Sequence, residues 1–221
     1  MMMIFKKPDI LSTIDDKFFD IAKVISITYQ DTKPWILDKH YANRMPNVKY
    51  SFGLLFKSQI IGICTFGIPG SPFLCKGICG IEYKDNVLEL NRLVINDGVP
   101  RNSASFLVAN SIKQLPPKSI LVSYADTKMG HIGYVYQATN WIYTGCTKER
   151  TDIYAGDGKH SRHHLGDKSN RQQRSAKHRY VYFHKCPKEI KNNLRYPVLS
   201  YPKGETRRYK TPKIATQQML F

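Results

Sequence analysis

Acidic residues and long hydrophobic runs are both scarce in this sequence. Of its 221 residues, 17 are Asp or Glu and 34 are Lys or Arg, which gives a formal net charge of +17. A field this positive attracts polyanions far more readily than neutral solutes, so nucleic acid is the first partner to consider. No apolar stretch approaches the roughly 20 residues that a membrane-spanning helix needs. A soluble protein without membrane contact is therefore expected.

Cysteine is also scarce, and its spacing is irregular. The five cysteines are an odd number, and the stretch that begins at Met1 does not have the pattern of a secretory signal, so reduced thiols in a cytosolic protein are expected. Cys75 and Cys79 form a C-x3-C pair, but no second pair follows at zinc-finger spacing, which argues against structural zinc. Hydrophobic residues make up 42% of the chain. That content is enough for a core and argues against disorder.

The pattern of apolar residues predicts a mixed α/β fold. Helical spacing indicates helices over residues 13–30, 35–44, 103–114 and 131–139. Apolar runs rich in β-forming residues indicate a hairpin over 48–69 and strands over 87–95, 119–126, 141–147 and 179–185, with a loop-like insert over 69–86. We expect residues 1–185 to form one catalytic domain with a basic insertion at 148–179. Residues 186–221 are expected to form a basic C-terminal tail.

The segment 159–179 has the composition of a nucleic-acid contact. It holds seven Lys or Arg, four His and a single Asp, with almost no apolar residues. Each phosphate contacted by a cationic side chain releases condensed counterions, so binding through this segment would weaken steeply with salt. The alternative is a basic loop that is only solvated. The predicted DNA contacts are Lys159, Arg162, Lys168, Arg171, Arg174, Lys177 and Arg179.

The order of helices and strands resembles the GNAT acyltransferase fold, in which helices flank a mixed central sheet whose middle strands are splayed. In that family a strand leads into a loop whose amides bind the pyrophosphate of an acyl-CoA donor. Here the strand carries Arg92, and the loop reads "VPRNSAS". The resemblance implies a donor site formed by Arg92, Arg101, Asn102, Ser103, Ser105 and, on the next strand, Ser123. The family's glycine-rich pattern is absent, so an ordinary Ser-capped helix is the alternative.

A second part of the resemblance is the stretch "GYVYQATNWIYTG". Tyr136 lies where GNAT enzymes commonly keep a tyrosine that protonates the departing thiolate, a task that a phenol can perform. The alternative is that Tyr136 is only an aromatic residue at the edge of the core.

Three separated segments, together with a basic stretch and "HRYVYF", resemble the Mom proteins of bacteriophage Mu and its relatives, within the same superfamily. The segments are "HYANRMP", "ELNRLVINDGVPRNSASFL" and "SYADTKMGHIGYVYQATNWIYTG", and the similarity covers roughly residues 35–185. It implies modification of the N6 amine of adenine in double-stranded phage DNA, giving a methylcarbamoyl-type base that host restriction enzymes no longer read. It also implies action in the cytoplasm of the infected host.

The same resemblance assigns catalytic roles to His40, Tyr41, Asp126 and Tyr136. Mom proteins are thought to hold iron, for which the imidazole of His40 and the phenolate of Tyr41 are suitable ligands. The alternative for this pair is an ordinary surface pair. Asp126 follows an apolar strand and can orient an amine or accept its proton, or it can simply cap the next turn.

The substrate implied by the resemblance sets further demands. Adenine's amine lies within the stacked duplex, so an enzyme must flip the base into a pocket, where aromatic side chains stack on it. The candidates for stacking are Tyr41, Tyr124, Tyr134 and Trp141. Two other functions remain open, namely a GNAT acetyltransferase for a protein or small amine and a noncatalytic DNA-binding protein. The sequence leaves the donor's identity undecided and does not distinguish a monomer from a homodimer.

Overall fold

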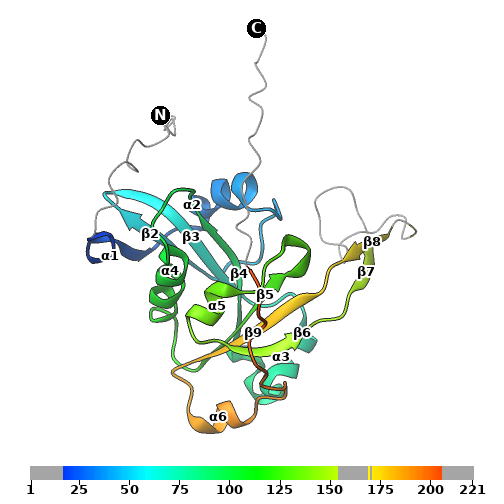
Figure 1. Cartoon of the computed structure of the whole chain (residues 1–221). Coiled ribbons are helices and arrows are strands. Elements are labelled where there is room, and N and C mark those ends of the chain that lie inside the picture. The colour runs from blue at the N-terminus through cyan, green and yellow to red at the C-terminus, as the bar shows by residue number, and fades with distance from the viewer. Residues whose placement is uncertain (1–16, 154–168, 170, 206–221) are drawn as a thin grey trace.

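The computed structural model describes residues 17–153, 169 and 171–205, and Figure 1 shows a central sheet flanked by helices. Seven strands form this sheet in the order β1-β2-β3-β4-β5-β9-β6, and β7 pairs with β8 in a separate two-stranded sheet. Among the strands that the structure describes, β4 and β5 are the only parallel neighbours. The strands are β1 (Lys23–Ser26), β2 (Tyr50–Phe56), β3 (Gln59–Gly67), β4 (Val87–Ile95), β5 (Ser119–Asp126), β6 (Ile142–Cys146), β7 (Arg150–Ile153), β8 (Arg171–Arg174) and β9 (Lys177–His184). The mixed sheet confirms the predicted α/β class.

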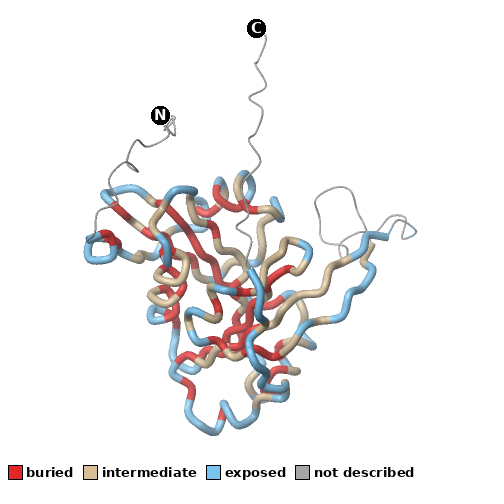
Figure 2. Tube along the Cα trace, in the orientation of Figure 1, coloured by how far each residue is buried: buried red, intermediate tan, exposed pale blue. Residues whose placement is uncertain are grey.

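Helices cover both faces of the sheet. They are α1 (Phe18–Ile21), α2 (Tyr29–Pro34), the π-helical turn η2 (Trp35–Lys39), α3 (Pro72–Cys79), α4 (Ser103–Ile112), α5 (Tyr134–Ala138) and α6 (Lys188–Asn192), with 3-10 turns η3 (Ile81–Asn86) and η4 (Thr127–Met129). On one face α4 and α5 pack against Leu88, Leu121 and Tyr180. On the other face α3 and α6 pack against Val87, Val122 and Val181. The buried residues therefore run along the middle strands, as Figure 2 shows.

The parallel strands β4 and β5 separate soon after they meet. Only three residue pairs join them, the last being Glu89 with Val122, although both strands continue beyond this point. Past that point the Ser123 hydroxyl donates a 2.8 Å hydrogen bond to the carbonyl of Leu90. A side chain thus satisfies a backbone group that the sheet ladder would otherwise pair. The predicted splaying of the middle strands is confirmed.

Two of the predicted elements are wrong. Residues 23–26, predicted as helix, form β1, because Val24 and Ile25 pair with β2 at the edge of the sheet. β-branched side chains fit such a strand better than a helix. The insert over 69–86, predicted as a loop, contains α3 and η3. Ser71 caps α3 and Pro72 begins it, a combination that favours a helix start, and its apolar side chains are buried against the sheet.

Other expected elements are confirmed. Lys57 and Ser58 join β2 to β3 with φ values of 45° and 63°, as a tight hairpin turn requires. The strands at 87–95 and 119–126 and the helix starting at Ser103 lie where predicted, whereas α5 is shorter than the predicted helix over 131–139.

Residues 186–205, predicted to begin a C-terminal tail, pack against the rest of the domain. Ile190 of α6 belongs to the core beneath α3, and Leu199 forms a bridge to Tyr143 of β6. The Tyr201 hydroxyl donates a 2.8 Å hydrogen bond to the carbonyl of Trp141. None of the described helices is long and apolar enough to cross a bilayer.

Candidate active site

Polar side chains gather on the face of the sheet opposite α4, where β4 and β5 separate. Side chains of a strand alternate between the two faces, and Val87, Val122 and Val181 all point away from α4. Glu89, Asp126 and Lys177 are at even spacing from them and share that direction, and the bulge in β4 opposite Thr65 and Phe66 brings Arg92 to the same face. We define the polar face as Glu89, Arg92, Asp126 and Lys177. It also includes His40, Tyr41 and His131, whose pKa values are shifted by the charges of these residues. Three strands and two loops far apart in the sequence thus supply one surface.

His40 follows η2 and is buried, with 8% of its surface exposed. Its Nδ1 accepts a 3.0 Å hydrogen bond from the backbone N–H of Ala42. Burial, together with the smaller effects of Arg92 and His131, lowers the pKa of His40 to about 3. The imidazole is therefore neutral at pH 7, and because Nδ1 accepts, its proton lies on Nε2.

Tyr41 stacks on His40, with ring centroids 4.3 Å apart and planes at 28°. The His131 ring meets Tyr41 at 6.1 Å in an edge-on contact. Burial and the negative charge of Asp126 raise the pKa of Tyr41, while Arg92 opposes them. The phenol is therefore protonated near neutral pH.

The His40–Tyr41 pair is an incomplete ligand set for iron. Nδ1 of His40 already accepts from the backbone N–H of Ala42, so the pair could present only the Nε2 of His40 and the oxygen of Tyr41. A metal ligand must present a lone pair and is deprotonated in the complex. Within the described ranges, no group of three or more His, Cys, Asp or Glu side chains is arranged to hold an ion. No step of the chemistry is therefore assigned to a metal.

Arg92 connects β4 to the segment that carries His40. Its guanidinium donates to the carbonyls of Asn91 at 2.6 Å and Arg44 at 2.7 Å, and its buried Nε has no hydrogen-bond partner in the described part of the chain. Burial lowers the pKa of Arg92, and Tyr41 raises it. The structure thus brings Arg92 to His40 and Tyr41, on the face away from α4, and does not bring it to the loop at 99–105.

Asp126 is fully engaged by neighbouring donors. It caps η4 by accepting from the Lys128 backbone N–H at 3.0 Å, accepts from the Ser175 hydroxyl at 2.5 Å and forms a short ion pair with Lys177. Burial alone would raise the pKa of Asp126, but the hydrogen bonds from Lys177 and Ser175 outweigh it, and the pKa lies below its ordinary value. The predicted turn cap is present. The carboxylate, which was also a candidate proton acceptor, already accepts three hydrogen bonds.

Glu89 is a polar-face residue that sequence reasoning missed. It lies at the last paired position of β4 and β5 and is bordered by β3 on its other side, at Gly67. Burial raises the pKa of Glu89 to about 7, and the positive charges of Arg92 and Lys177 restrain the rise. The available signal was a single acidic residue inside the apolar run "VLELNRLVI", since an interior strand has no solvated edge for a charge.

The loop before α4 and the groove beside that helix lie on the other face of the sheet. Asn102 has a left-handed conformation with φ of 71°, and no side chain caps α4. The hydroxyls of Ser103 and Ser105 donate to the carbonyls of Pro100 and Asn102. Arg101 is exposed. A groove of about 510 Å³ runs between α4 and α5, lined by residues that include Asn102, Ser105, Phe106, Asn110, Asn140 and Tyr182.

Ser123 and Tyr136 occupy the gap between the separated strands. The Ser123 Oγ lies 2.8 Å from the Tyr136 hydroxyl as well as 2.8 Å from the carbonyl of Leu90. When Ser123 donates to Leu90, the tyrosine donates to Ser123. Burial raises the pKa of Tyr136, which packs against Trp141 and Tyr180. Tyr136 is thus both a core aromatic residue and a protonated phenol at the gap.

The candidates for base stacking differ in accessibility. Trp141 is 0% exposed and packs in the core, so it is unavailable for stacking on a base. Tyr124 packs against the core beneath α3, and Tyr134 is 45% exposed at the start of α5. Tyr41 is covered on one side by His40.

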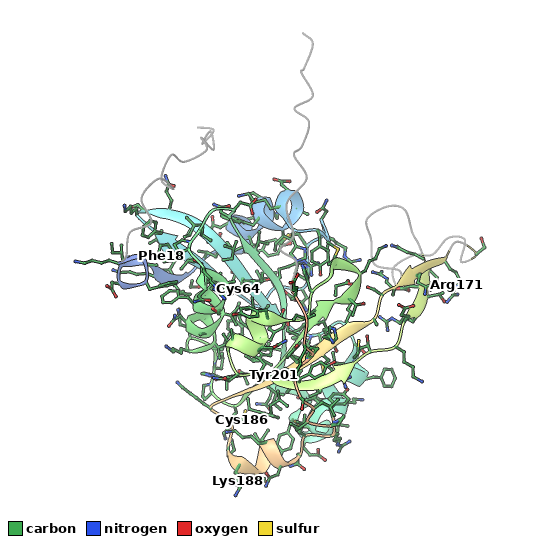
Figure 3. All side chains as sticks on the ribbon, in the orientation of Figure 1. Phe18, Cys64, Arg171, Cys186, Lys188 and Tyr201 are labelled. Atoms are coloured by element: carbon green, nitrogen blue, oxygen red, sulfur yellow. The ribbon has the colours of Figure 1, made fainter. Side chains whose placement is uncertain are left out.

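The basic residues predicted to contact DNA fall into three groups. Lys159, Arg162 and Lys168 lie outside the described residues. Lys177 pairs with Asp126, and Arg179 donates to the Thr144 hydroxyl at 2.9 Å while covering the ring of Tyr196. Arg174 pairs with Asp152 at 3.3 Å on the β7–β8 hairpin. Arg171 is exposed on the same hairpin, which projects from the body of the protein in Figure 3.

Solved acetyltransferases share part of this backbone arrangement. A GNAT-family acetyltransferase from Bacillus cereus is 12% identical with a TM-score of 0.43, covering 74% of this chain and 97% of the other. An N-acetyltransferase from Staphylococcus aureus Mu50 is 13% identical with a TM-score of 0.45, covering 73% of this chain and 98% of the other.

The sequence comparisons are more specific. Methylcarbamoylase mom of Escherichia phage Mu is 29% identical over 128 residues, which are 56% of this chain and 52% of that protein. The matched part thus spans about half the length of the phage Mu relative. The model of the Mom protein family matches residues 22–203, which include every residue of the polar face and the gap. The chain therefore belongs to the Mom protein family.

Proposed function

We propose that the protein transfers a methylcarbamoyl-type group to the N6 amine of adenine in double-stranded DNA. Its target is phage DNA in the cytoplasm of the infected host, where the altered base escapes restriction. The relative from phage Mu is a methylcarbamoylase, which supports this group as the one transferred. The reaction class is a transfer of an activated carbonyl carbon to a nitrogen nucleophile.

The separation of β4 from β5 beyond Glu89 is the observation that carries the proposal. A continuous sheet would separate its two faces with backbone, whereas at the gap only the side chains of Ser123 and Tyr136 separate them. The α4–α5 groove opens on one face, and the polar face lies on the other. Ser123 and Tyr136 are hydrogen-bonded to each other at the gap.

The groove fits an elongated acyl-CoA-like donor. Its lining combines amide, hydroxyl and aromatic side chains, and the first turn of α4 and the charge of Arg101 would hold a diphosphate there. Such a donor, when bound, supplies a carbonyl carbon that carries a good leaving group. Burial raises the pKa of Tyr136, so its phenol is protonated and would give a proton to that leaving group.

The polar face would receive the flipped adenine. Arg92 holds the His40–Tyr41 segment in position through the carbonyl of Arg44. The neutral His40 has its proton on Nε2, and Tyr41 is a protonated phenol, so both can donate hydrogen bonds. The net charge of +17 supports an anionic polymer as the partner.

Mass spectrometry of nucleosides tests the proposal. DNA from bacteria that express the protein is digested to nucleosides and compared with DNA from bacteria that carry the empty vector. A deoxyadenosine carrying the methylcarbamoyl group is expected only in the first sample. An unmodified nucleoside pool with newly acetylated proteins or amines would instead identify an ordinary acetyltransferase, and no modification of either kind would leave a DNA-binding protein.

A further inference from the structure

The β7–β8 ribbon stands apart from the main sheet and has no core of its own. In the described part of the chain its strands pair only with each other, and Figure 1 shows them projecting beyond the edge of the seven-stranded sheet. Among the residues of the two strands, Ile153 is the only apolar one. A two-stranded ribbon alone is at best marginally stable in water. A ribbon that is polar on both faces is suited to a partner that is itself polar.

The ribbon is fixed to the polar face at its base. β8 runs through Ser175 into β9, and the Ser175 hydroxyl donates a 2.5 Å hydrogen bond to Asp126. Before β7, the Thr147 N–H donates to the carbonyl of Lys177 at 2.9 Å, and the Lys177 N–H donates to the Thr147 hydroxyl at 3.0 Å. Lys177 also forms the ion pair with Asp126. Both strands thus leave the body of the protein beside the surface that would receive the target base.

The register of the ribbon divides its side chains between two faces. One face, which we call the inner face, carries the cross-strand pairs Arg150–Arg174 and Asp152–Gln172. The outer face carries the pairs Thr151–Gln173 and Ile153–Arg171. Burial lowers the pKa of Arg44, Arg174 also lowers it, and Asp152 raises it, so both inner-face residues lie near Arg44. The carbonyl of Arg44 accepts from Arg92. The inner face therefore borders the polar face.

Two side chains of the inner face are available to a ligand. Arg150 and Gln172 are exposed, and within the described residues neither side chain has a hydrogen-bond or ion-pair partner. The other two side chains of this face pair with each other at 3.3 Å. On the outer face, Gln173 donates to the carboxylate of Glu149 at 2.9 Å. The ribbon thus presents one free arginine and one free glutamine on the side of the polar face.

Arginine and glutamine are well suited to reading base edges in the major groove of DNA. An arginine donates two hydrogen bonds to O6 and N7 of guanine, and a glutamine forms two with N6 and N7 of adenine. The groove is about 12 Å wide and admits a two-stranded ribbon, whose strands lie about 4.8 Å apart. A strand of this length spans about 13 Å. Because base pairs are stacked about 3.4 Å apart, such a ribbon reaches about three or four base pairs.

We propose that the inner face of the ribbon enters the major groove beside the target adenine, where Arg150 and Gln172 read the neighbouring base pairs. This inference rests on the proposed function, to which it adds the residues that select the sequence context. The net charge of +17 attracts any duplex, because phosphates are the same in every sequence. Contacts to base edges are needed to distinguish one sequence from another.

Mapping of modified adenines in cells tests this role. Plasmid DNA from bacteria that express the protein is read by a single-molecule sequencing method that detects the modified base, and the modified fraction is scored for each flanking sequence. The wild-type protein should favour a subset of contexts. Gln172→Ala should lower the ratio between favoured and disfavoured contexts on the order of tenfold at one neighbouring position, and Arg150→Ala should do so at another. Gln173→Ala, the same change on the outer face, should keep the wild-type preference.

A chemical footprint tests the groove without requiring catalysis. Dimethyl sulfate methylates N7 of guanine, which lies in the major groove, and N3 of adenine, which lies in the minor groove. A short duplex with guanines on both sides of one adenine is treated at protein concentrations that saturate binding in an anisotropy titration. The wild-type protein should protect guanine N7 and leave adenine N3 reactive. Combining Arg150→Ala with Gln172→Ala should abolish the protection, whereas Gln173→Ala should retain it.

The outcomes distinguish two errors. The role of the ribbon is overturned by a wild-type protein that modifies adenine equally in every context, by a Gln172→Ala protein with wild-type context ratios, or by protection of adenine N3 in place of guanine N7. A wild-type protein that modifies no adenine overturns the proposed function, and the footprint then still decides whether the ribbon occupies the major groove.

Discussion

The polar face contains two carboxylates in opposite states. Asp126, at the end of β5, accepts hydrogen bonds from three groups, and its pKa is lowered. Glu89, at the divergence of β4 from β5, has no such donors in the described chain, and its pKa is raised to about 7. Hydrogen bonding thus decides which buried carboxylate stabilises the fold and which remains available for chemistry.

The largest expected effect comes from removing the cation that acts on Glu89. Arg92→Ala should reduce adenine modification by on the order of 100-fold or more, because it removes a fixed positive charge and releases the carbonyl of Arg44, which positions the segment that carries His40. The guanidinium also lowers the pKa of Glu89, so in the variant this carboxyl should stay protonated to a higher pH. Modification rates measure the first effect, and the pH dependence of unfolding measures the second.

Arg92→Lys provides the control for this prediction. It keeps the charge near Glu89 but cannot reproduce the two hydrogen bonds of the guanidinium fork. The rate should fall, while the pH dependence of unfolding stays close to that of the wild type. An Arg92→Ala protein with an unchanged rate would show that modification does not depend on the hydrogen bond from Arg92 to the carbonyl of Arg44.

Asp126→Asn should produce the largest loss of stability. It removes a buried charge-assisted contact and leaves Lys177 without its partner, at a cost of about 2–3 kcal/mol. The folded-state pKa of Asp126 is depressed, so its contribution is present above the unfolded value near 3.8 and is lost as the pH falls through the lower folded value. Urea unfolding at pH 7 measures the loss. A change below about 0.5 kcal/mol would mean that the ion pair contributes little.

Glu89→Gln should change stability in the opposite direction. The folded-state pKa is raised, so the favourable contribution of the protonated side chain is present below the model value of 4.5 and is lost as the pH rises through about 7. At pH 8 the variant should therefore be more stable than the wild type by on the order of 1–2 kcal/mol, and the two should converge near pH 4.5. Thermal melts at both pH values provide the measurement, and a variant less stable at pH 8 would contradict the picture.

The difference between these carboxylates also explains what the sequence could and could not predict. Asp126 follows a clear apolar strand, and its position at a strand end made both a catalytic role and a turn cap foreseeable. Glu89 could not be predicted as a site residue from the sequence, because its protonation state depends on which strands flank β4 and on where β5 turns away. Alternation along one strand gives the face of a residue but not the partners that other strands bring to it.

The same limit applies to the helices. The helix at Ser103 was predictable from local spacing and two following prolines, whereas the strand at residues 23–26 was not, because its pairing with β2 outweighed a helix-like spacing. Arg92 was assigned to the donor loop by its place in the chain. The bulge opposite Thr65 and Phe66 sets the face of β4 on which its side chain lies.

The cations show the same contrast between charges paired with an acidic group and charges that remain free to bind a ligand. The smallest expected effect, on duplex binding, comes from one of the free cations. Arg171 is exposed on the β7–β8 hairpin and donates to the neutral hydroxyl of Thr151, and within the described residues no acidic side chain pairs with it. Arg171→Ala should weaken duplex binding a few-fold and reduce the slope of log K against log salt by about 1. Lys188 on α6, which Figure 3 shows away from the hairpin, provides the matched control. Lys188→Ala should leave the slope unchanged, and equal slopes for both variants would place the duplex elsewhere.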